Sequence, residues 1–193
     1  MKYSLHKIIR IKDLTKNYFE LIIDKGKIPV GFGTQIFLHN PLNFEHKSSY
    51  IIASGIQEQW IRLILNKNNE PLIYSLLKNS TLKIDSIVVE RFPDLMADTK
   101  KEKELIFIVD DDGVALLFNW ISSNITIKPK HIYYLSNDPI NKNWFIENQY
   151  PISFNMPKLI LPSDVYYVNG SSELIQQIQI TQKDCLPRIK FES

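Results

Sequence analysis

One five-residue run constrains the fold of this chain more than any other segment. Residues 105–109 (LIFIV) are all apolar and do not alternate with polar residues, which is typical of a strand buried on both faces of a parallel sheet. Asp110, Asp111, Asp112 and Gly113 follow at once, and the apolar stretch after them, through Ile121, predicts a helix. Parallel strands need crossovers of this kind. The run therefore predicts a small α/β domain around it.

The rest of the second half fits that domain. Further strands are expected at residues 131–135, 158–161, 165–168 and 188–191. A helix is expected at residues 173–180, with Ser172 as its cap and the Glu173 carboxylate in its first turn. Strand–helix alternation implies a parallel sheet. Between residues 135 and 161 the prolines interrupt any long element, so the domain looks trimmed: Pro139, Pro151 and Pro157.

The first half is a series of short β-branched and aromatic segments divided by turn residues. Strands are expected at 7–11, 18–23, 35–39, 49–54, 59–66 and 81–91, with one or two helical turns at 72–77. Short strands at this spacing favour a closed or nearly closed barrel. The fold class is therefore α+β in two domains: an antiparallel β-barrel over residues 1–95, a charged linker, and an α/β parallel-sheet domain over 103–193.

Composition excludes several classes of function. The formal net charge of +2 gives no electrostatic footprint for nucleic acid, and no apolar run has the length of a membrane span. The single cysteine, Cys185, permits no internal disulfide, so we expect a reducing, cytoplasmic setting. No metal site is expected, because the histidines lack partners at ligand spacing.

The order of the barrel segments resembles the ferredoxin–NADP reductase superfamily, which includes the NAD(P)H–flavin reductases. Residues 48–54 (SSYIIAS) lie where that family has arg-pro-tyr-ser-ile-ala-ser. The resemblance implies that FAD or FMN binds along this segment, with Tyr50 stacking on the flavin and Ile52 and Ser54 also at the flavin site. The arginine that holds the flavin phosphate is replaced by Ser48, and the serine near the flavin N5 by Ile51. Against this, Tyr50 is also an ordinary strand residue.

The second half resembles the nicotinamide-binding domain of the same family. Residues 107–117 (FIVDDDGVALL) lie where phe-ile-ala-gly-gly-thr-gly-ile-ala-pro-leu is usual, and residues 165–171 (VYYVNGS) lie where val-tyr-val-cys-gly-pro is usual. The resemblance places Gly113, Asn169 and Gly170 at the cofactor site. Asn169 replaces the cysteine beside the nicotinamide ring, and a simple strand-to-helix turn at Asn169 is the alternative interpretation.

Aspartates replace the glycines of the phosphate loop. Carboxylates suit a helix N-terminus, so we expect them to cap the helix and fill the anion site themselves. Two like charges about 5 Å apart repel by roughly 3 kcal/mol at an effective dielectric near 20. NAD(P)H binding is therefore doubtful. A cation site is the other interpretation, but no further acidic cluster is evident.

Three hypotheses follow. The first is a flavin reductase or ferredoxin reductase-like oxidoreductase whose nicotinamide binding is weakened or lost. The second is a catalytically inactive descendant that serves as a protein-binding or scaffolding subunit. The third, a barrel for single-stranded nucleic acid, is opposed by the balanced charge. No residue is predicted to be catalytic, and partners are a flavin, a nicotinamide or a protein, with no nucleic acid and no membrane span.

Overall fold

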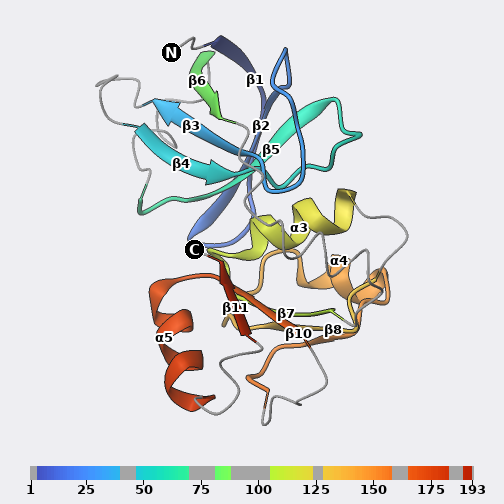
Figure 1. Cartoon of the computed structure of the whole chain (residues 1–193). Coiled ribbons are helices and arrows are strands. Elements are labelled where there is room, and N and C mark those ends of the chain that lie inside the picture. Colours follow the sequence, from blue (N-terminus) through green and yellow to red (C-terminus); the bar gives the residue numbers. More distant parts are fainter. Residues whose placement is uncertain are drawn as a thin grey trace. The chain divides into compact units, whose positions relative to one another are not determined.

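A computed structural model describes residues 4–39, 47–69, 81–87, 105–123, 128–157, 165–182 and 189–192. The chain forms two compact units (Figure 1). The first contains residues 1–91 and 118–123, and the second contains residues 92–117 and 124–193. The helical turns expected at 72–77, the linker at 94–104 and the strand at 158–161 lie outside the described residues.

The first unit is an antiparallel sheet of six strands in the order β4-β3-β6-β1-β2-β5, coloured blue to green in Figure 1. The strands are β1 (Ser4–Asp13), β2 (Tyr18–Asp24), β3 (Gln35–His39), β4 (Lys47–Ile51), β5 (Trp60–Asn66) and β6 (Thr81–Ile87). All six were expected from the sequence. Two bounds differ clearly from expectation: β1 is longer than the expected 7–11, and β4 ends at Ile51 and not at residue 54. Residues 88–91 of the last expected strand lie outside the described residues.

Backbone hydrogen bonds bring the two ends of this sheet together. Directly after β4, the Ile52 N–H donates to the carbonyl of Thr34 at 3.0 Å, and the Ala53 N–H donates to the carbonyl of Arg62 in β5 at 2.7 Å. The chain after β4 therefore reaches the opposite edge strand, as barrel closure requires. Alternate side chains of β2 and β5 point inward and form the core of this barrel: Phe19, Leu21, Ile23, Ile61, Leu63 and Leu65, none of them exposed.

The second unit is a five-stranded sheet in the order β11-β10-β7-β8-β9. Its strands are β7 (Leu105–Val109), β8 (His131–Tyr134), β9 (Ile152–Ser153), β10 (Val165–Asn169) and β11 (Ile189–Glu192), and neighbouring strands pair in parallel. All five residues of β7 are buried. The fold class expected from the sequence, an antiparallel barrel followed by a parallel α/β sheet, is confirmed.

Three helices complete the described chain: α3 (Val114–Ser123), α4 (Lys142–Glu147) and α5 (Ser172–Thr181). The cap of α5 is Ser171, whose hydroxyl accepts the Leu174 N–H at 3.2 Å, so the expectation of Ser172 was wrong by one residue. Glu173 lies in the first turn as expected. Helix α4 and strand β9 were not predicted, because the prolines beside them limit both to very short elements.

Candidate functional site

The centre of the candidate site is the Asp110 carboxylate at the carboxyl end of β7. Its Oδ1 accepts the backbone N–H groups of Asp112 and Gly113, each at 3.1 Å, and its Oδ2 accepts the Ser171 N–H at 2.9 Å. One carboxylate thus joins the turn before α3 to the start of α5. Free N–H groups at such turns form anion sites in dinucleotide-binding folds. Here an anion of the chain itself accepts their hydrogen bonds.

Two glycines permit the close approach of these loops. A Cβ added to Gly113 would lie 1.9 Å from the carbonyl oxygen of Asn169, and one added to Gly170 would lie 2.4 Å from Oδ1 of Asp110. Neither glycine has a positive φ, so the constraint is space and not backbone conformation. The three residues expected at the nicotinamide side are therefore brought together, with Asp110 among them.

Asp111 has different partners. Its carboxylate accepts the hydroxyl protons of Tyr134 at 2.7 Å and Ser136 at 2.6 Å. Burial raises the pKa of Asp111 above its usual value, and these hydrogen bonds oppose the shift. Burial, followed by the charge of Asp111, also raises the pKa of Tyr134 strongly. The Tyr134 hydroxyl in turn accepts the Ile140 N–H at 3.0 Å, so the network fixes the chain after β8.

Asp112 and Asn169 differ in exposure. Asp112 is exposed, while Asn169 is buried with 6% of its surface exposed. Of the three aspartates, Asp110 is the one whose carboxylate accepts the N–H groups of Asp112, Gly113 and Ser171. The sequence did not indicate the Ser171 N–H as a member of this site, although its position directly after Asn169 and Gly170 was the available signal.

The flavin-side residues lie in the first unit. Tyr50 is paired with Ile36 across β3 and β4 and is half-buried against the barrel core. Ile52 is fully buried in that core, and its N–H donates to the carbonyl of Thr34. Ser54 is also fully buried, and its hydroxyl accepts the Arg62 N–H at 3.2 Å. Of the three predicted residues, Tyr50 alone has an accessible side chain.

A buried amide fixes the segment after β4. The Asn119 side chain, which is fully buried, accepts the Gly33 N–H at 2.9 Å and donates to the carbonyl of Ser54 at 2.6 Å. Asn119 belongs to the first unit together with both partners. Asn119 was not among the residues expected at a site from the sequence. A single amide inside an otherwise apolar helical stretch was the signal that could have found it.

No protein-family profile and no curated protein matches this sequence. Solved structures do. Ferredoxin–NADP⁺ reductase from Plasmodium falciparum is 14% identical, with a TM-score of 0.75 over 98% of this chain and 95% of the other. Flavohemoglobin from Malassezia yamatoensis, with bound FAD and heme, is 11% identical, with a TM-score of 0.76 over 100% of this chain and 60% of the other.

The chain has the ferredoxin–NADP reductase fold. A third structure with this reductase fold, from Neisseria gonorrhoeae with bound FAD and NADP, is 12% identical, with a TM-score of 0.69 over 100% of this chain and 98% of that one. The resemblance expected from the sequence is thus confirmed for the fold. Within the part of the chain that the structure describes, no His, Cys, Asp and Glu side chains gather as a metal site, and no helix is long and apolar enough to span a membrane.

Proposed function

We propose that this protein is a flavin-binding, reductase-fold oxidoreductase that has lost nicotinamide dinucleotide binding at its Asp110 loop. The observation that carries the proposal is the Asp110 carboxylate, which accepts the N–H groups of Asp112, Gly113 and Ser171. The resemblance to the reductase family implies that these loops are where backbone N–H groups would meet a pyrophosphate.

A pyrophosphate would have to displace Asp110 to reach those donors. The displaced carboxylate would remain near the phosphates, and two unit charges at about 5 Å repel by roughly 3 kcal/mol at an effective dielectric near 20. That energy corresponds to more than a hundredfold in affinity. The hydrogen bonds of Asp110 would be lost as well, so the site disfavours the dinucleotide in two ways.

Flavin binding is supported by the flavohemoglobin and the reductase of the same fold that contain FAD, and by the accessible Tyr50 on β4. An aromatic ring on a strand next to a ligand can stack on a planar cofactor. Lys47, exposed beside Ser48, would supply a point charge to a flavin phosphate in place of the absent arginine fork. A flavin that does not receive hydride from NAD(P)H would accept electrons from another donor.

The first test is flavin content. The purified full chain should absorb near 450 nm, or gain that absorbance and quench flavin fluorescence when titrated with FAD or FMN. Tyr50→Ala should weaken this binding, whereas Tyr18→Ala on β2, a half-buried tyrosine with no predicted flavin role, should not. A chain that binds neither flavin would refute the flavin half of the proposal.

The second test concerns the Asp110 loop. Asp110→Gly should bind NADPH more tightly than the wild-type chain, as measured by calorimetry. The matched control is Asp112→Gly, which removes a charge from the same loop but leaves the carboxylate that holds the N–H groups. Tight NADPH binding by the wild-type chain, or equal gains in the two variants, would refute the loss of dinucleotide binding.

One observation favours a second candidate, a cofactor-free subunit that binds another protein. Ser48 and Ile51 replace two of the three side chains that the resemblance assigns to flavin contacts on β4, and only Tyr50 is kept. The flavin titration distinguishes the two candidates, because the second predicts a colourless protein that excess flavin does not change.

A further inference from the structure

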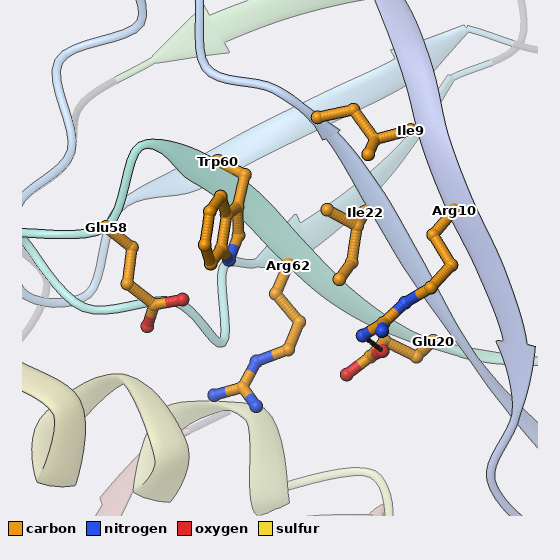
Figure 2. A pocket seen from close by; sticks show the side chains of 7 residues that line it. All are labelled: Ile9, Arg10, Glu20, Ile22, Glu58, Trp60 and Arg62. Atoms are coloured by element: carbon orange, nitrogen blue, oxygen red, sulfur yellow. Dashed lines mark hydrogen bonds and ion pairs between the residues drawn. The ribbon is translucent and has the colours of Figure 1, made fainter.

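A pocket of about 380 Å³ lies on the outer face of the first unit's sheet, on strands β1, β2 and β5 (Figure 2). Small-molecule sites have volumes of this order. None of the residues to which a flavin or nicotinamide role is assigned above lines this pocket. It is therefore a separate candidate site, and its chemistry can be derived from its own side chains.

A β-bulge shapes one wall. In the pairing of β1 with β2, Ile8 is opposite Ile23 and Arg10 is opposite Ile22, so Ile9 is the extra residue. A bulge interrupts the alternation of side chains, and here both Ile9 and Arg10 line the pocket. Bulges commonly redirect side chains next to functional sites.

The floor of the pocket is the outer face of β2. Glu20 and Ile22 face away from the barrel core, yet only 6% and 7% of their surfaces are exposed. Arg10 donates to Oε2 of Glu20 at 2.7 Å, so the buried carboxylate already has its counter-ion. The Arg10–Glu20 pair has no net charge.

Arg62, on β5, is the cation that remains. Its Nη2 donates to the carbonyl of Ala53 at 3.0 Å, and its guanidinium lies 5.2 Å from the centre of the Phe118 ring. These contacts hold the group in place. Among the described residues no carboxylate forms an ion pair with it. Glu20 is paired with Arg10. Glu58 is the other acidic side chain that lines the pocket, and it accepts the Gly55 N–H at 2.7 Å.

Apolar surface lies next to this positioned cation. Trp60 is 44% exposed and Ile9 is 56% exposed, and both line the same pocket. In Figure 2 the Trp60 ring and the Arg62 side chain extend from the same strand, apart from the Arg10–Glu20 pair. A planar guanidinium presents a fork of N–H donors that matches a carboxylate, and an indole ring offers a face for stacking.

We propose that this pocket binds a small aromatic carboxylate, with the carboxylate on Arg62 and the ring against Trp60 and Ile9. The anion would neutralise a guanidinium that the fold has already oriented, so little conformational entropy would be lost on binding. The proposal is independent of flavin and of the Asp110 loop.

The test uses the full chain with 1-naphthoate as the probe and 1-naphthylmethanol as its neutral analogue, with affinities measured by ligand-observed NMR. Naphthoate should bind at least about tenfold more tightly than the alcohol, because a hydrogen bond to a charged group contributes about 1.5–3 kcal/mol. Its affinity should also fall as salt is raised. Equal binding of the two probes, or no binding of naphthoate, would overturn the proposal without any variant being made.

Variants then locate the site. Arg62→Met should weaken naphthoate binding about tenfold or more, and Arg62→Lys should recover part of it, because lysine keeps the charge but not the fork. Trp60→Ala should weaken both probes. Lys27→Met removes an exposed cation of the same unit outside the pocket and should change neither. Naphthoate affinity that is unaltered in folded Arg62→Met and Arg62→Lys would place the probe elsewhere and contradict the assignment.

Discussion

Replacing Gly113 by alanine puts a methyl group where the structure has no room for one. The new Cβ would lie 1.9 Å from the carbonyl oxygen of Asn169 and 2.3 Å from its carbonyl carbon. Both obstacles are backbone atoms, at the end of a strand that is paired with β7 through Asn169 and Val109. Relief therefore requires the β7–α3 turn and the end of β10 to separate by about 1 Å.

An added group that forces packed elements apart lowers the free energy of unfolding by about 1–3 kcal/mol. A clash with backbone belongs at the upper end of that range, because paired backbone atoms move less easily than side chains. Alanine also lowers the entropy of the unfolded chain, which offsets less than 1 kcal/mol. We therefore expect Gly113→Ala to lower the free energy of unfolding by about 2–3 kcal/mol. For a chain of this length, that corresponds to a melting temperature lower by roughly 5–10 °C.

Thermal unfolding followed by circular dichroism measures this loss. The matched control is Gly31→Ala, because the nearest atom to its added Cβ is Oγ1 of Thr34 at an ordinary 3.6 Å, and its φ is not positive. The control should stay within about 1 kcal/mol of the wild-type chain. If Gly113→Ala melts at the wild-type temperature, the close approach of these two loops is not a real constraint and the reasoning about the site fails.

Three further predictions test other contacts. Gly170→Ala should lower the free energy of unfolding more in the wild-type chain than in the Asp110→Gly variant, because the added Cβ meets the Asp110 carboxylate. A double-mutant cycle in urea measures this coupling, and a coupling energy below about 0.5 kcal/mol would contradict the contact. Asn119→Leu should lose about 2–4 kcal/mol in urea unfolding, because it leaves a buried N–H and a buried carbonyl without partners; a loss below about 1 kcal/mol would disagree. Burial lowers the pKa of His131, so its unfolded form binds the proton more readily and stability should fall as the pH drops below about 6.5 through the folded-state pKa. His131→Gln should reduce this dependence of stability on pH. A His131 titration midpoint above about 6.5, measured by NMR, would contradict the prediction, because stability would then rise as the pH drops.

The sequence predicted most of the fold because the patterns are local. The uninterrupted apolar run of β7 and the alternation in β5 depend only on neighbouring residues. The end of β4 could not be read in this way. Residues 52–54 are as buried as a strand interior, but β4 ends at Ile51. Ile52 still bonds to Thr34 in the register of β3 and β4, whereas Ala53 bonds to Arg62 of β5.

The candidate site was predictable only in part. Three consecutive aspartates are equivalent in the sequence but differ in the structure, since Asp110 binds a backbone group 61 residues away and Asp111 binds side chains 23 and 25 residues away. Those partners are set by the parallel pairing of β7, which no local pattern specifies. Likewise, the bulge at Ile9 that redirects Arg10 depends on the register of two strands and not on either strand alone.

The glycines that remain in the second unit show which constraints still act on it. Gly113 and Gly170 lie where a Cβ would strike a neighbouring loop, so the packing of the loops alone requires them. Asp110, Asp111 and Asp112 lie where the resemblance places phosphate-loop glycines. The proposed loss of dinucleotide binding therefore requires no loss of the domain's own packing.

The amide of Asn119 sets a practical limit on dissecting this protein. Expression of residues 1–95 alone would remove the side chain that serves the Gly33 N–H and the Ser54 carbonyl, because residues 118–123 belong to the first unit although they come later in the chain. A truncated barrel should therefore be prone to local opening after β4. Reconstitution would need a peptide carrying α3 added back in trans, or a permuted gene in which that helix is joined to the barrel strands.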